Sequence, residues 1–168
     1  MNTKDNFIAK RGATLILKIT LLVIACVVIL LGIFALPDMW RGGQAEFPLV
    51  AFVFPPMVLG LYATMLPFFF GLWQAFKLIS YVEKNKTFSD LSVQAIKKIK
   101  YAALVIGIIY MSGLPLLYPI ADTDDAPGLL LFGFLFASIP IVVAVFAEVL
   151  ERLLQNAVDL KSENELTV

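Results

Sequence analysis

Four long stretches of this chain contain no charged residue. They cover residues 19–37, 47–76, 101–121 and 126–147. A helix needs about 20 predominantly apolar residues to cross the roughly 30 Å hydrocarbon core of a bilayer, and each stretch is long enough. The sequence therefore predicts an all-α integral membrane protein, an antiparallel bundle of four spanning helices. Because the chain has 168 residues, we expect residues 1–168 to form a single membrane domain.

Prolines indicate that the four spans are not equivalent. We expect spans at about residues 14–36, 55–80, 100–120 and 128–150. The first helix is predicted to end at Leu36 and Pro37, before a flexible turn over residues 41–44. The second stretch is too long for a single crossing, so residues 47–54 are interpreted as outer-interface material or a bent lead-in. Pro67 is expected to kink the second span, and Pro115 and Pro119 to bend the end of the third, because proline lacks an amide proton.

The basic residues lie almost entirely on one side of the predicted membrane. Of the 13 lysines and arginines, only Arg41 falls in a loop facing the other way. The remainder precede the first span, lie between the second and third spans, or follow the fourth. Since cytoplasmic loops carry the excess of Lys and Arg, both termini and the middle loop are predicted to be cytoplasmic.

Two of these basic-side segments have an amphipathic pattern, and they are predicted to be cytoplasmic extensions of the third and fourth helices. Ser89 is a plausible N-cap. The helix after it places apolar residues such as Phe88 and Ile96 on one face and lysines on another, which favours contact with anionic headgroups over a protein partner. After Glu148, leucines again form one stripe, as in a surface helix. Ten residues are therefore predicted to contact lipid or a partner: Phe88, Lys97, Lys98, Lys100, Glu148, Arg152, Glu163, Asn164, Glu165 and Leu166.

Candidate chemical sites are few. The chain has no histidine and one cysteine, Cys26. Cys26 ends a sequence similar to a lipoprotein cleavage box, but the chain stays apolar beyond it, so we interpret it as a small apolar residue within the first span. Glu148 is the carboxylate nearest the hydrocarbon, and an interfacial role is favoured over a functional one. It lies four residues before Arg152, which predicts a favourable i, i+4 ion pair.

The acidic loop from Asp122 to Asp125 could offer oxygen ligands to a divalent cation, but EF-hand spacing is absent and an acidic translocated turn is favoured. Small residues spaced four apart, such as Ala103 and Gly107, are typical of close helix packing. We find no nucleophile–base pair, phosphate loop or metal cluster in the sequence. No catalytic, cofactor-binding or metal site is therefore expected, nor direct binding of nucleic acid.

Two segments carry a resemblance to a known family. They are residues 145–154 with 163–168, and residues 86–89 leading into 96–100. They resemble the bacterial domain-of-unknown-function family 2975, small four-span inner-membrane proteins in which a phenylalanine opens the helix before the third span and a Glu-Asn-Asp/Glu-Leu-Thr-Val/Ile tail ends the chain. The resemblance implies a bacterial plasma-membrane location. Its members are often encoded beside a small helix-turn-helix regulator, which is consistent with a regulatory or protective role.

Three functions remain in competition at this point. The first is a non-catalytic membrane protein that binds a partner, either a cytoplasmic regulator or a second copy, through its cytoplasmic face. The second is a small oligomeric transporter or pore, for which the spans offer few polar residues. The third, an intramembrane enzyme, lacks a catalytic pair. The sequence favours them in that order.

Overall fold

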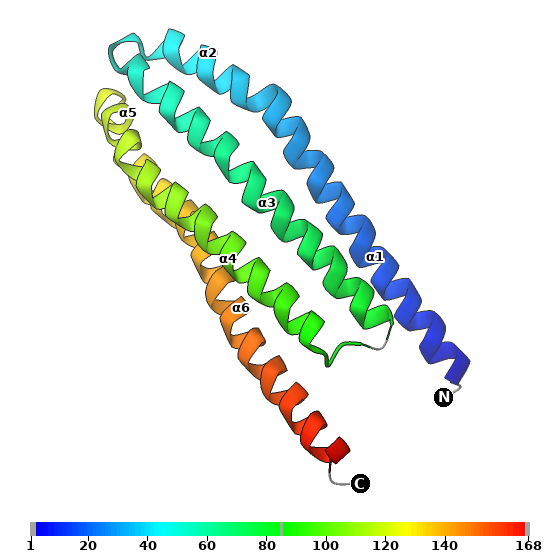
Figure 1. The fold of residues 1–168 in the computed structure, drawn as a ribbon. Coiled ribbons are helices and arrows are strands. Elements are labelled where there is room, and N and C mark those ends of the chain that lie inside the picture. Colours follow the sequence, from blue (N-terminus) through cyan, green and yellow to red (C-terminus); the bar gives the residue numbers. More distant parts are fainter. Residues whose placement is uncertain (1–2, 85, 167–168) are drawn as a thin grey trace.

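Four long helical segments lie antiparallel in a row (Figure 1). The computed structural model describes the backbone of residues 3–84 and 86–166, and the side chains of residues 12–84 and 86–163. Helix α1 (Thr3–Leu30) packs on α3 (Phe54–Glu83), α3 on α4 (Asp90–Gly113), and α4 on α6 (Gly128–Leu166). The described residues contain no strand. The prediction of an all-α antiparallel four-helix fold is confirmed, with α1 and α6 as the outermost helices.

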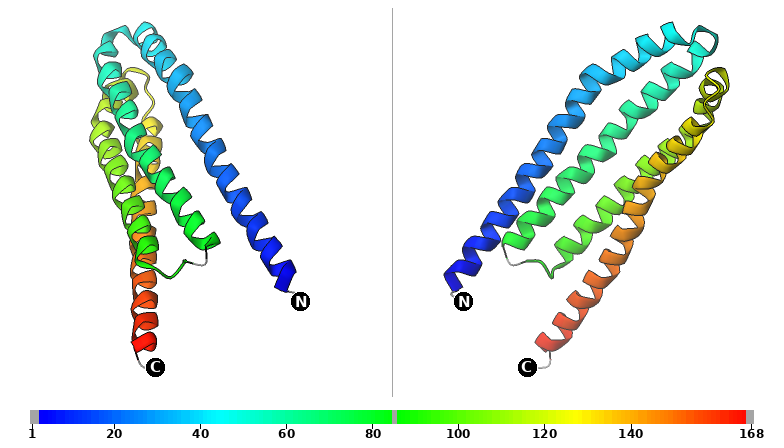
Figure 2. Two further views of the ribbon diagram at one scale, coloured as in Figure 1. Left: turned by 45° about the vertical axis from the view of Figure 1, so that its right-hand side comes forward. Right: turned by 180° about the vertical axis from the view of Figure 1, so that it is seen from behind.

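The two ends of the row of helices are made of different chain segments. The start of α1, the end of α6 and the α3–α4 connection lie together at one end, which we call the basic end (Figure 2). At the opposite, distal end lie α2 (Leu36–Glu46), the 3₁₀ segment η2 (Pro48–Val53) and α5 (Tyr118–Thr123). Four helical runs are long and apolar enough to cross a membrane: Gly12–Glu46, Pro48–Glu83, Asp90–Thr123 and Gly128–Glu163. They correspond one to one with the four predicted spans.

The first span continues beyond its predicted end. Leu36 and Pro37 do not stop the helix, and residues 41–44 are helical rather than a flexible turn; both predictions are wrong. The reason is a π-helical turn, η1 (Leu31–Ala35), in which the Leu36 amide donates to the Leu31 carbonyl. In this wider register Pro37 faces the Gly32 carbonyl without an amide to donate. The Tyr62 hydroxyl of α3 donates to that carbonyl instead, at 2.8 Å.

Prolines shape the distal end as expected. Residues 48–53 form the 3₁₀ segment η2 before α3 begins, which confirms a non-α lead-in, and Pro67 lies inside α3. Beyond α4 the chain passes through η3 (Leu114–Leu117) into the short α5. The best-buried apolar cluster of the described residues is here, around Val53 and Phe54 of η2 and α3 and Ile120 of α5. It closes the distal end by hydrophobic burial.

Small residues set the spacing of α3, α4 and α6. A Cβ at Gly71 would lie 3.6 Å from the Ala102 Cβ, and one at Gly107 would lie 2.7 Å from Ile141 Cγ1. Ala144 and Ala147 are also buried along α6. Without a hydrophobic driving force between helices in lipid, such close approach supplies the packing energy. The prediction that small residues allow close helix packing is thus confirmed for Gly107, and the contact is with another helix of the same chain.

Candidate functional site

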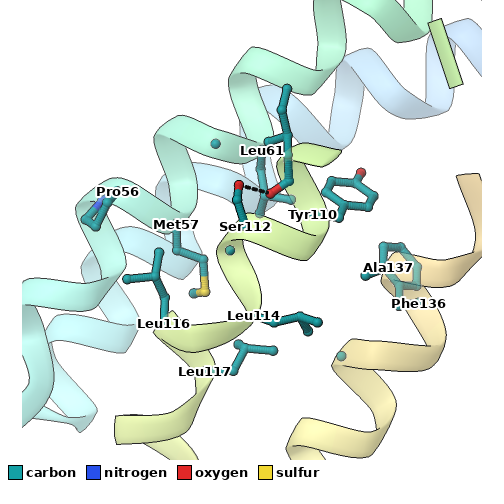
Figure 3. A pocket seen from close by; sticks show the side chains of 14 residues that line it. Pro56, Met57, Leu61, Tyr110, Ser112, Leu114, Leu116, Leu117, Phe136 and Ala137 are labelled. Carbon is teal, nitrogen blue, oxygen red and sulfur yellow. Dashed lines mark hydrogen bonds between the residues drawn. The ribbon is translucent and has the colours of Figure 1, made fainter. Parts of the chain in front are cut away.

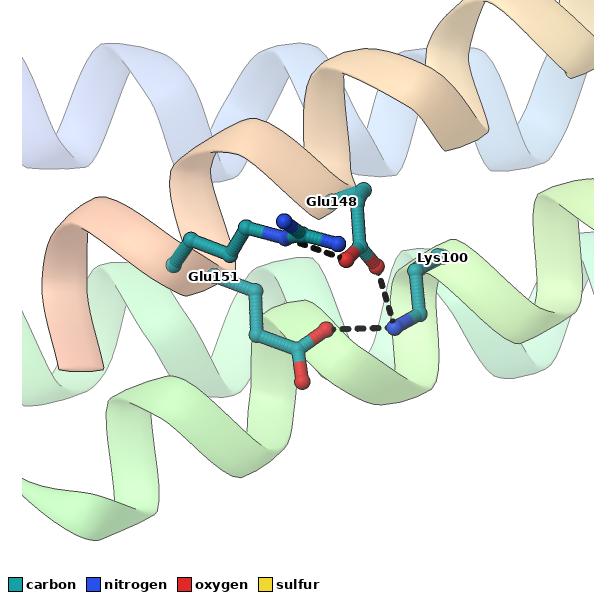
Figure 4. Close-up of polar contacts among 4 residues, drawn as sticks. Lys100, Glu148 and Glu151 are labelled. Atoms are coloured by element: carbon teal, nitrogen blue, oxygen red, sulfur yellow. Dashed lines mark hydrogen bonds and ion pairs between the residues drawn. The ribbon is translucent and has the colours of Figure 1, made fainter.

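The most elaborate polar cluster of the described residues joins α4 to α6 at the basic end. Lys100 Nζ lies 2.7 Å from Glu148 Oε2 and 2.7 Å from Glu151 Oε2 (Figure 4). The side chains of Lys100 and Glu151 are largely buried, at 13% and 17% exposure. One ammonium therefore holds two carboxylates that lie nearly one helical turn apart on α6. We call Lys100, Glu148, Glu151 and Arg152 the ion cluster.

Arg152 completes the ion cluster from the outside. Its Nε donates to Glu148 Oε1 at 2.7 Å, the i, i+4 pair that the sequence suggests. Arg152 is itself 77% exposed, so its contribution is that of a surface ion pair. Glu148 thus has cationic partners on two sides. The sequence pattern did not indicate the pairing with Lys100, because 48 residues separate the two.

A belt of lysines over aromatic rings marks the basic end on three helices. Lys18 Nζ lies 5.3 Å from the ring centroid of Phe76, Lys77 lies 5.5 Å from Trp73, and Lys100 lies 4.9 Å from Tyr101. Lys18 also forms an ion pair with Glu83, which ties α1 to α3. Aromatic rings and long cationic side chains typically settle at the level of the headgroups. The belt is therefore consistent with a membrane boundary at this level.

The apolar and basic residues near the start of α4 differ in how exposed they are. Ala95 and Ile96 are buried within the protein, whereas Phe88 is 55% exposed. Lys97 and Lys98 are also exposed, while Lys100 is taken up by the ion cluster. Much of the apolar face assigned to lipid is thus turned towards neighbouring helices. Phe88, Lys97 and Lys98 remain available to a ligand or partner.

Ser89 stands at the N-cap position of α4 but does not cap it with its side chain. Its hydroxyl donates to the Lys86 carbonyl at 2.7 Å, and the buried Ser92 hydroxyl donates to the same carbonyl at 3.0 Å. These two bonds anchor the connection between α3 and α4. The predicted position of the helix start is confirmed, while the bonding differs because both hydroxyls turn back to the loop.

The end of α6 carries the remaining predicted contact residues. The helix passes without a break from the apolar span through the ion cluster to Leu166. Leu153 and Leu160 are each 61% exposed beyond the cluster. Glu163 lies on this segment, and the side chains of Asn164, Glu165 and Leu166 fall outside the described residues. We call residues 148–166 the α6 extension.

A cavity of about 300 Å³ opens between α3, η3 and α6 in the distal half (Figure 3). Most of its lining is apolar, including Met57, Leu114 and Phe136, and the Ser112 hydroxyl donates to the Ile109 carbonyl rather than into the cavity. Three glycines, Gly60, Gly113 and Gly133, leave the space open. The lining provides room for apolar groups but no acid–base pair.

The acidic loop at the distal end forms a compact turn. Asp125 adopts a left-handed conformation with φ of 49°, and the Ala126 amide donates to the Ala121 carbonyl at 2.9 Å. This is the geometry that commonly ends a helix. Within residues whose side chains the structure describes, no three His, Cys, Asp or Glu side chains gather to hold a metal ion.

The fold and this polar boundary define a multi-pass α-helical membrane protein. Residues 38–168 match the family described as "Protein of unknown function (DUF2975)", so this chain belongs to that family. The chain is also 46% identical over 158 residues to the "Uncharacterized membrane protein YoaS" of Bacillus subtilis (strain 168), covering 94% of this chain and 99% of that protein. No solved structure matches the chain. The resemblance seen in residues 86–100 and 145–168 is confirmed.

Proposed function

We propose that this protein is a non-catalytic bacterial plasma-membrane protein that binds a protein partner through its basic end, which faces the cytoplasm. The α6 extension and the exposed start of α4 form the binding surface. One observation carries the proposal: Leu153 and Leu160 are exposed on a helix that continues in line with a membrane span, beyond the ion cluster.

The continuous course of α6 supports a protein partner in preference to lipid as the recipient of these leucines. About five turns of helix, roughly 28 Å, extend from Glu148 to Leu166. An amphipathic helix buries its apolar face in lipid by lying in the interface plane. Because α6 does not bend after its span, leucines farther along the extension leave the headgroup region. Exposed apolar side chains grouped in this way are typical of a protein interaction site.

The ion cluster supports the proposal by holding the α6 extension in place. Lys100 bridges to two carboxylates on consecutive turns, so α6 is fixed in rotation as well as in position relative to α4. A surface that is ordered before binding loses less conformational entropy when a partner docks. The cluster is thus interpreted as a support for the binding surface and not as a catalytic group.

The proposal that the protein is non-catalytic rests on the residue types in the chain and on the ion pairs of Glu148. The chain contains no histidine, the commonest general base. Glu148, the carboxylate closest to the hydrocarbon, is engaged by Lys100 and Arg152. A carboxylate with two cationic partners is better suited to an interhelical clamp than to proton transfer.

Co-purification in mild detergent tests this function. Deleting residues 160–168 is expected to reduce the amount of partner recovered at least tenfold and to leave membrane insertion intact. The deletion removes the exposed Leu160 but no residue of the ion cluster. The variants Leu153→Ser and Leu160→Ser should act in the same direction. Gln155→Ser is the matched control on another face of α6. Normal partner recovery by the truncated protein would remove the α6 extension as the binding surface.

A further inference from the structure

The α6 helix carries a strict heptad repeat on one face. When the seven positions of each heptad are lettered a to g, the residues at positions a and d follow one another at alternating steps of three and four residues without interruption. The members are Val143, Phe146, Leu150, Leu153, Ala157, Leu160 and Asn164. A repeat of 3.5 residues keeps one seam facing a partner helix along its whole length, which is the geometry that a coiled coil needs. We call these residues the heptad stripe.

The heptad stripe is separate from the face of α6 that packs within the chain. Ala144 and Ala147 are buried and Glu151 pairs with Lys100 on α4. By contrast, Phe146, Leu150 and Leu153 are between 54% and 67% exposed. Because α6 is an outermost helix of the row, its far side is open to another molecule (Figure 2).

We propose that the occupant of the heptad stripe is the same stripe of a second copy, giving a parallel two-stranded coiled coil that runs from the basic half of the membrane into the cytoplasm. This inference rests on the proposed function, since it names the partner of that surface. Two copies in one membrane have the same direction and the same depth. Their stripes therefore meet in parallel and in register, and each a or d residue faces its own counterpart.

The charges flanking the stripe are compatible with self-pairing. In a parallel coiled coil, a residue at position g of one helix lies opposite a residue at position e of the other helix. The residue at position e is the one five positions later in the sequence. Val149 then faces Leu154, and Asn156 faces Lys161, so no like charges are opposed over these turns. Charged Glu148 and Arg152 occupy the outer positions f and c. Because no pair of like charges is opposed along this rim, two copies can approach without electrostatic repulsion.

Ala157 lies at the a position between Leu153 and Leu160. Its small side chain permits a second helix to approach closely at the centre of the stripe.

Cysteine cross-linking in native membranes tests this inference. Cys26 is the one cysteine of the chain, so Cys26→Ser gives a background without thiols. Single substitutions Leu153→Cys, Ala157→Cys and Leu160→Cys place a thiol on the stripe. Gln155→Cys and Ser162→Cys, at f positions, are the matched controls. With a short thiol-specific cross-linker, we expect the stripe positions to give at least ten times more covalent dimer than the f positions.

The outcomes separate this inference from the proposed function. Equal dimer yields at stripe and f positions, or none at either with normal insertion, would overturn the coiled coil. Cross-links from the stripe to a protein of different mass would reject the second copy while retaining partner binding. Two differently tagged copies provide a second measurement: Leu153→Glu with Leu160→Glu should reduce their co-isolation at least tenfold, whereas Gln155→Glu with Ser162→Glu should not. Unchanged co-isolation in the first pair would also overturn the inference.

Discussion

Helices α1 and α6 are both outermost helices with mostly exposed apolar spans, yet they are attached to the fold by different means. Helix α6 is held by small residues along its packed face and by the ion cluster at its exit from the span. Helix α1 packs on α3, where the Tyr62–Gly32 hydrogen bond and the Lys18–Glu83 ion pair hold it. The two helices therefore differ mainly in their polar contacts, because close packing contributes to both: a Cβ at Gly32, in η1 directly after α1, would overlap Met65 of α3.

This contrast also separates two roles of charge at the basic end. In the ion cluster, the side chains of Lys100 and Glu151 are largely buried and fix α6 against α4. The Lys18–Glu83 pair is more exposed, with side chains at 24% and 29%. Salt and solvent weaken exposed pairs far more than buried ones. We therefore expect α1 to be the more easily detached of the two outer helices, and four variants test this expectation.

The largest effect is expected from Lys100→Ala, which leaves two carboxylates facing each other without their shared ammonium. We expect a larger loss in the free energy of unfolding than for the other three variants, because two carboxylates on α6 lose their shared cation at once. Unfolding in mixed detergent micelles measures it. Lys98→Ala, at an exposed site on the same helix, is the control. Similar stabilities for the two variants would show that the cluster does not secure α6.

Gly107→Ala is expected to lower the free energy of unfolding by about 2 kcal/mol, because the new methyl group on α4 would overlap the Ile141 side chain of α6. Gly113→Ala, where a Cβ meets no atom within 4 Å, is the matched control and should be neutral or slightly stabilising. The same micelle titration gives both values. If Gly107→Ala were as stable as Gly113→Ala, small-residue packing would not explain the attachment of α6.

Tyr62→Phe removes the donor that satisfies the Gly32 carbonyl in the π-helical turn. The expected cost is about 1.5 kcal/mol, the penalty of one unpaired buried carbonyl. Amide hydrogen exchange should rise locally in Leu31–Ala35 and α2, with little change in α6. Tyr118→Phe, at an exposed tyrosine, serves as the control. Unaltered exchange near Gly32 would mean that this hydrogen bond does not hold α1.

The smallest effect is expected from Lys18→Met, which removes the ion pair with Glu83. A loss of about 0.5 kcal/mol is typical of a pair open to solvent. The difference from the wild-type protein should shrink as salt is added, because screening already weakens the pair. Lys97→Met provides the comparison. A cost as large as that of Lys100→Ala would contradict the distinction between the two outer helices.

Part of the candidate site could be anticipated from the sequence. The amphipathic pattern after residue 148 placed leucines on one face of a helix, and the i, i+4 spacing identified Glu148 and Arg152 as a pair. The sequence did not indicate Lys100 as the centre of the ion cluster, because it looked like one of several lysines on a polar face. Which lysine turns inward depends on how α4 is rotated against α6, and local spacing does not contain that information.

The first span shows the same limit in the backbone. Pro37 and the glycines at 42 and 43 predicted the end of the helix and a turn, yet the helix continues through both. The π-helical turn leaves the Gly32 carbonyl without a backbone donor, and a tyrosine 30 residues away supplies one. A proline ends a helix only when the backbone groups it orphans find no better partner, and that partner belongs to another helix.

The sequence by itself predicted an all-α protein with four helices long and apolar enough to span a membrane, and it identified the two segments that carry the family likeness. These conclusions follow from local composition, since apolar length and proline positions act residue by residue along the chain. The tertiary structure decided the order of the helices in the row, the inward turn of Lys100, the Tyr62–Gly32 bond and which face of α6 stays exposed. Those features depend on the relative rotation of helices far apart in the sequence, which is set by side-chain packing and by the pairing of buried polar groups.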